Sequence, residues 1–191
     1  IDGQVHFRDP GLTHKGDFYT ESKAAIAGGV TSFIDMPNTV PNILTSESLK
    51  EKYEIASKKS LANYSFFYGV NGDNIDEVIE MDTSKFIGVS DDGLYFTKKG
   101  NLLADSPEKL EKLFANCKCI IAIHSEREEN IEINEQLFRE KYGEDIPAKF
   151  HPLIRNAKCC YEATKRAIDI AKKHNARLHI LHLTTEAETH L

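Results

Sequence analysis

The chain has 191 residues, of which 40% are hydrophobic and 28% charged, and its formal net charge is −6. This composition is typical of a soluble globular protein with a sizeable apolar core, and it predicts a single domain over residues 1–191. The basic residues are scattered among acidic ones, which argues against a nucleic-acid surface. Membrane association is not expected either, because no apolar run approaches the roughly 20 residues of a membrane-spanning helix. The chain starts without Met and without a secretory signal, so we expect it to be part of a longer polypeptide.

Six short β-rich segments alternate with longer amphipathic segments. In chain order, the predicted strands are Gln4–Phe7, Val30–Met36, Tyr64–Val70, Lys85–Ser90, Cys119–His124 and Arg177–Leu183. The predicted helices are Phe18–Ala27, Glu47–Lys59, Ile75–Met81, Pro107–Asn116, Glu128–Glu140 and Cys160–His174. Strict alternation predicts an α/β fold with a parallel sheet, either doubly wound or closed into a (β/α)8 TIM barrel. The density of elements favours the barrel, in incomplete form with about six βα units.

Two segments stand apart from this alternation. Residues 141–156, KYGEDIPAKFHPLIRN, are predicted to form the longest loop and to overhang the strand ends. His151 and Arg155 are interpreted as packed residues of that loop. Residues 184–191 are predicted to begin a further helix.

The four cysteines occur as Cys117 with Cys119 and as the adjacent pair Cys159 and Cys160, and no CxxC spacing is present. This usage favours small buried thiols over disulfides or a zinc-thiolate site, and it predicts a reducing, cytoplasmic location.

Polar side chains collect where the predicted strands end. The first strand carries Gln4, His6 and Arg8, the fourth runs into SDDG at residues 90–93, and the fifth and sixth end near His124 and His182. Because the carboxyl ends of parallel strands meet at one edge of a sheet, these groups are expected to converge. Imidazole nitrogens and carboxylate oxygens are ligands for Zn²⁺ or a similar divalent ion, and ligands from separate strands leave positions open for water and substrate. The pattern therefore predicts a catalytic metal site that supplies hydroxide at neutral pH.

Two motifs resemble those of a known family. VHFRDPG at residues 5–11, followed by AAIAGGVTSFIDMPNTVPN at residues 24–42, is similar to the DxHxHxR[ED]PG and DMPNT signatures of the dihydroorotases, in the cyclic amidohydrolase superfamily. SDDG, AIHSE at residues 122–126 and HILHLTT at residues 179–185 agree with this family in order and spacing. The resemblance covers essentially the whole chain.

The resemblance implies a ligand set for one or two zinc ions. His6, His124 and His182 correspond to metal ligands, and an aspartate of SDDG corresponds to the metal bridge. Asp91 is favoured over Asp92 for that bridge.

The resemblance also implies a substrate site. Arg8 and Asn38 correspond to residues that bind the substrate carboxylate, and an Arg fork with an amide donor suits a planar anion. From the residues alone, Arg8 could instead form an ion pair with Asp9 or Asp17.

The activity that follows from the resemblance is the reversible interconversion of N-carbamoyl-L-aspartate and dihydroorotate in pyrimidine biosynthesis. The metal polarises the ring carbonyl, hydroxide attacks, and an acid protonates the departing nitrogen. In the family this acid is an aspartate on strand eight, which this chain lacks, so the isolated chain is expected to be inactive and its parent to be a homo-oligomer.

One departure from the family pattern keeps other readings open. Gln4 replaces the first His of HxH, and we expect it near the metal pocket but outside the ligand set. One alternative is a hydantoinase or allantoinase, which would have the same arrangement of metal ligands. Another is a non-catalytic scaffold protein, in which the loss of a ligand at Gln4 would be explained. The joint presence of the remaining site residues favours an enzyme.

Overall fold

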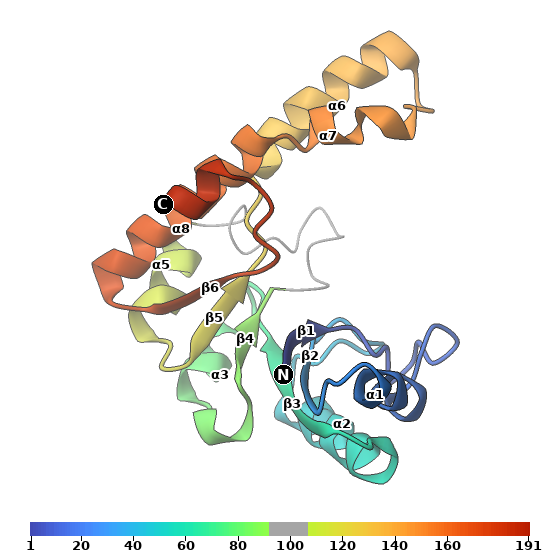
Figure 1. Ribbon diagram of the computed structural model, residues 1–191. Helices are drawn as coiled ribbons and strands as arrows, with labels where there is room; N and C mark the ends of the chain where they lie inside the picture. Colours follow the sequence, from blue (N-terminus) through green and yellow to red (C-terminus); the bar gives the residue numbers. More distant parts are fainter. Residues whose placement is uncertain (92–106) are drawn as a thin grey trace.

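The computed structural model describes residues 1–91 and 107–191 and contains a curled parallel sheet with helices on its outer side (Figure 1). The strands are β1 (Asp2–Val5), β2 (Ser32–Asp35), β3 (Asn63–Gly69), β4 (Gly88–Ser90), β5 (Ile120–Ile123) and β6 (Arg177–Ile180). They pair in sequential order, each parallel to the next. The predicted incomplete TIM barrel is therefore confirmed. Because all strands run the same way, their carboxyl ends meet at one rim.

Helices follow the strands in the predicted alternation. The α-helices are α1 (Phe18–Ala27), α2 (Ser46–Lys59), α3 (Ile75–Glu80), α5 (Pro107–Asn116), α6 (Glu128–Tyr142), α7 (His151–Ile154) and α8 (Ala157–His174). Single 3₁₀ turns occur at η1 (Thr83–Lys85), η2 (Ala148–Phe150) and η3 (Ala187–His190). Side-chain caps explain several of the starts, because Asp17, Thr45 and Asn156 accept backbone N–H bonds at the amino ends of α1, α2 and α8. Among the described residues, no helix is both long and apolar enough to span a membrane.

The prediction that residues 141–156 form a continuous loop was wrong in detail. It contains η2 and α7, and with α6 it forms an arm that projects from the barrel (Figure 1). Aromatic packing explains this order, since the ring centroids of Tyr142 and Phe150 lie 4.4 Å apart and those of Phe138 and Phe150 5.1 Å apart. The further helix predicted at residues 184–191 is only the single turn η3.

The apolar core has a layer on each face of the sheet. The larger layer lies between sheet and helices and includes Phe18, Phe33 and Phe66, all fully buried or nearly so. A smaller cluster includes Met36 and Phe67. The neighbours Phe66 and Phe67 point to opposite faces because side chains alternate along a strand. Apolar side chains therefore lie on both faces of the sheet, as in the wall of a barrel.

Candidate active site at the carboxyl ends of the strands

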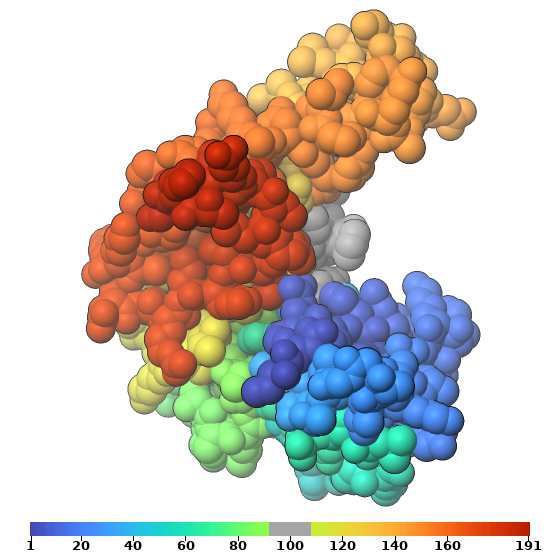
Figure 2. Space-filling view, in the orientation of Figure 1, coloured from blue at the N-terminus to red at the C-terminus, as the bar shows by residue number. Residues whose placement is uncertain are grey.

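A hollow of about 710 Å³ lies at the carboxyl rim of the sheet. Five of the residues predicted for the site line it: His6, Arg8, Asn38, His124 and His182. The space-filling view shows the chain hollowed between its N-terminal part, in blue, and its C-terminal part, in orange and red (Figure 2). Residues more than 170 positions apart in the sequence therefore contribute to one cavity.

The ends of β4, β5 and β6 bring three of the predicted ligands together. Asp91 follows β4 and is 1% exposed, and its Oδ1 accepts the backbone N–H of His124 at 3.0 Å. The same oxygen lies 3.0 Å from His124 Nδ1. The rings of His124 and His182 lie next to each other, with centroids 4.9 Å apart. Asp92 lies outside the described residues.

The chemistry of this cluster fits a metal ion. Asp91 Oδ2 is buried, and no donor among the described residues reaches it, an arrangement that is costly unless a cation or donor satisfies the oxygen. Carboxylate and imidazole donors are the ligand types that zinc binds. Even so, within residues 1–91 and 107–191 no three His, Cys, Asp or Glu side chains are close enough to hold a metal ion as they stand. The cluster matches zinc in ligand type.

His6 contacts the β2 side of the hollow. Its Nδ1 lies 2.9 Å from Asn38 Oδ1, which joins the end of β1 to the DMPN segment. Gln4 is a half-buried residue within β1 and is not among the residues that line the hollow.

Two residues of the hollow have left-handed backbone conformations. Arg8 has φ of 66° and His182 has φ of 34°. Such angles are uncommon for residues with a Cβ and are often found at functional sites. The two aspartates considered as ion-pair partners of Arg8 bind other groups. Asp9 forms an ion pair with Lys59 at 2.7 Å, and Asp17 caps α1.

The second wall of the hollow includes residues of the segment that was predicted to overhang the strand ends, but their place in the site was not predicted. His151 and Arg155, interpreted as packed loop residues, line the cavity instead, and Arg155 forms an ion pair with Glu126. The HPLIR segment reaches the rim because α7 turns the chain back from the arm toward α8. The sequence signal that could have indicated this wall is the closeness of an imidazole, His151, and a guanidinium, Arg155, in the HPLIR segment.

Glu188 and Cys160 also line this wall. Glu188 is buried and accepts hydrogen bonds from Thr164 at 2.6 Å and Thr185 at 2.5 Å, which anchors the segment after His182 to α8. Burial, followed by the charges of Glu126 and Glu188, raises the pKa of Cys160 to about 11. Cys160 is therefore a neutral thiol at pH 7 and a poor nucleophile.

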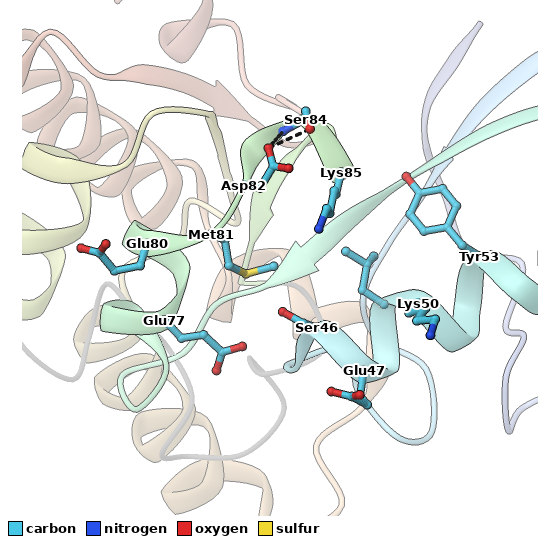
Figure 3. Close-up of a pocket in the computed structure, with 11 residues that line it drawn as sticks. Ser46, Glu47, Lys50, Tyr53, Glu77, Glu80, Met81, Asp82, Ser84 and Lys85 are labelled. Atoms are coloured by element: carbon cyan, nitrogen blue, oxygen red, sulfur yellow. Dashed lines mark hydrogen bonds between the residues drawn. The ribbon is translucent and has the colours of Figure 1, made fainter.

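A larger cavity, of about 850 Å³, lies elsewhere, between α2 and the α3–η1 segment. Figure 3 shows its wall of mixed charge, with Glu47 and Lys50 from α2 facing Glu77 from α3 and Lys85 from η1. None of the residues predicted for catalysis lines it. Size alone does not identify the active site here.

Comparison with known proteins shows which proteins the chain resembles. No family model matches the chain. The dihydroorotase of Methanosarcina mazei is 33% identical over 189 residues, which cover 97% of this chain and 40% of that protein. The dihydroorotase of Streptococcus thermophilus is 33% identical over 190 residues, covering 96% and 42%, and the allantoinase of Bacillus velezensis is 30% identical over 192 residues, covering 97% and 41%.

Solved structures agree on the fold. The L-hydantoinase of Arthrobacter aurescens superposes with a TM-score of 0.85 at 23% identity, covering 99% of this chain and 42% of that one. The chain spans about 40% of the length of the curated relatives it matches.

Proposed function

The chain is related over almost its whole length to the dihydroorotases of the cyclic amidohydrolase superfamily, and from this relationship we propose that it forms part of a zinc-dependent dihydroorotase. The reaction is the reversible hydrolysis of dihydroorotate to N-carbamoyl-L-aspartate, a step of pyrimidine biosynthesis. Residues 1–191 are proposed to be the N-terminal and central part of a single barrel domain. One observation carries the proposal: Asp91 contacts His124, the ring of His124 lies beside that of His182, and both imidazoles line the same hollow as Arg8 and Asn38. Among the described residues, no donor reaches the buried Oδ2 of Asp91.

We propose that Asp91, His124, His182 and His6 hold one or two zinc ions. When bound, zinc supplies a Lewis acid for the amide carbonyl and hydroxide at neutral pH. Asp91 Oδ1 accepts from His124 Nδ1, which orients the ring and leaves Nε2 as its ligand atom. Asp91 Oδ2 is the oxygen that can bind the metal. Gln4 is assigned no ligand role.

The substrate carboxylate is proposed to bind Arg8 and Asn38. A guanidinium fork binds a planar anion with two parallel hydrogen bonds. His6 engages Asn38 Oδ1, so the side-chain NH₂ of Asn38 is the group that suits the carboxylate. The two residues would orient the ring with its amide toward His124 and His182, which line the same hollow. Protonation of the departing nitrogen is assigned to an aspartate on a strand beyond the six described.

Further properties follow as proposals. We place the enzyme in the cytoplasm, where the four free thiols stay reduced, with a small-molecule substrate and a homo-oligomeric state. Residues 1–191 alone are expected to show no turnover, because β1 and β6 are unpaired edges of the described sheet.

Two other functions have specific support. The allantoinase relative and the hydantoinase fold favour a different cyclic amide as substrate. Gln4 favours a non-catalytic scaffold, because a carboxamide is a weaker zinc ligand than imidazole.

The deciding experiment measures bound zinc and the hydrolysis of dihydroorotate, hydantoin and allantoin by the complete gene product. Stoichiometric zinc with turnover of dihydroorotate supports the proposal. Turnover of hydantoin or allantoin alone supports the second function, and absence of both zinc and turnover supports the scaffold.

A further inference from the structure

Lys52 is a lysine of α2 that is completely buried, with a side-chain exposure of 0%. Its Nζ forms an ion pair with Asp35 Oδ2 at 2.7 Å, and Asp35 is 1% exposed. A buried ion pair is a costly way to fill a core, and apolar side chains of similar volume are often at least as stabilising. We propose that Lys52 and Asp35 are positioning residues, which fix the end of β1 relative to the end of β2 and so align His6 and Arg8 with Asn38. The functional part of this inference rests on the proposed dihydroorotase activity.

Asp35 connects the pair to β1. Its Oδ1 accepts the backbone N–H of Phe7 at 2.7 Å, within the buried interior. Phe7 lies between His6 and Arg8 in the sequence. Because the Asp35 carboxylate binds the main chain at Phe7, it fixes the backbone from which the side chains of His6 and Arg8 extend. A second bond runs alongside, from Met36 N–H to the carbonyl oxygen of Val5 at 3.0 Å.

Lys52 connects the pair to β2. Its Nζ also donates to the carbonyl oxygen of Met36 at 2.7 Å. Met36 lies two residues before Asn38, at the point where β2 ends. The ammonium group lies 4.8 Å from the centroid of the Phe66 ring, which holds the lysine from β3.

Both polar contacts to the main chain are therefore made at the segments that carry site residues. Phe7 is the junction of His6 and Arg8, Met36 leads to Asn38, and His6 and Asn38 meet at 2.9 Å in the hollow. A pair that served only to fill the core would have no need of these two main-chain contacts. Lys52 reaches them from the outer helix without entering the hollow, so it acts through the residues that bind substrate.

The first test is kinetic and uses the complete, zinc-loaded gene product. Lys52→Met leaves Asp35 buried without its cation, and we expect KM for dihydroorotate to rise about tenfold with kcat changed less than about threefold. Lys52→Met with Asp35→Asn keeps an oxygen for Phe7 N–H and removes the unpaired charge, so KM should return part of the way. Lys50→Met, an exposed lysine of the same helix, is the matched control and should leave both constants unchanged.

The second test does not depend on activity. Hydrogen exchange should be faster in Lys52→Met at residues 5–9 and 35–39, and unchanged at β5. Unchanged KM and exchange in a folded variant would overturn the proposal, as would exchange that rises equally in all strands. If Lys52→Met does not fold, Asp35→Asn alone is tested by the same two readouts, and the same results overturn the proposal. If the unmodified protein does not hydrolyse dihydroorotate, the proposed function fails, and exchange at residues 5–9 still decides whether the pair fixes β1.

Discussion

Asp91 and His124 follow neighbouring strands and meet at the rim of the barrel, where Asp91 Oδ1 lies 3.0 Å from both the backbone nitrogen and Nδ1 of His124. One carboxylate oxygen of Asp91 thus holds both the main chain and the ring of His124, and the other is buried and has no donor within residues 1–91 and 107–191. The different surroundings of the two Asp91 oxygens are the physical basis for the metal site proposed at Asp91 and His124.

Asp91→Asn should remove metal and activity together. The amide keeps an oxygen for the His124 backbone but loses the charge that offsets a divalent cation. We expect bound zinc to fall by more than half and kcat/KM by about three orders of magnitude, a loss typical of a group used directly in catalysis. Metal analysis and steady-state kinetics measure both. Asp145→Asn, in the exposed arm, should change neither, and full zinc with full activity in Asp91→Asn would exclude Asp91 as a ligand.

Arg8→Lys should weaken substrate binding selectively. Lysine keeps the charge but lacks the planar fork, so two parallel hydrogen bonds to the carboxylate become one. KM for dihydroorotate should rise by roughly tenfold to a hundredfold, with zinc content unchanged. The control is Arg177→Lys, at the exposed amino end of β6. If Arg8→Lys leaves KM unaltered, the carboxylate binds elsewhere.

Gln4→His should raise the zinc content of the protein without being required for turnover. The substitution places an imidazole two residues before His6, which is the spacing of the HxH motif of the family that the sequence resembles. Zinc per chain and kcat are measured side by side in the two proteins. Activity that appears only after the substitution would mean that Gln4 marks a lost ligand.

The rate of thiol alkylation should depend differently on pH for Cys117 and for Cys160. A hydrogen bond from the Cys119 thiol lowers the pKa of Cys117 to about 7, whereas burial raises that of Cys160 to about 11. Because the thiolate is the reactive form, Cys117 should react slowly below pH 7 and fast above it, and Cys160 should stay slow up to about pH 10. Iodoacetamide labelling followed by peptide mass spectrometry gives both rates. Faster labelling of Cys160 than of Cys117 at pH 8 would contradict these environments.

Much of the fold was predictable because its signals are local. The bounds of α1 follow from the Asp17 cap and the glycines after Ala27, and they match the prediction residue for residue. Strand ends were less accurate. The last strand was predicted to reach Leu183 but ends at Ile180, because the chain leaves the sheet before His182, which has a left-handed backbone. A pattern of apolar residues does not record such a turn.

The site was predictable only in part. The residues that end the strands were recognisable, because parallel strands bring their carboxyl ends together whatever lies between them. Arg155 reaches the hollow because α7 turns the chain back from the arm toward α8, a path that a local sequence pattern does not predict. Lys52 was not recognisable at all, because a lysine in a helix rich in charged residues is normally exposed.

The most direct test of the central claim is the zinc content and dihydroorotate turnover of the complete gene product, before and after removal of metal with a chelator. We expect close to one or two zinc ions per chain, turnover that is lost on chelation, and recovery when zinc is returned. Turnover of dihydroorotate that persists in metal-free protein, or stoichiometric zinc with no turnover of dihydroorotate, would contradict the assignment.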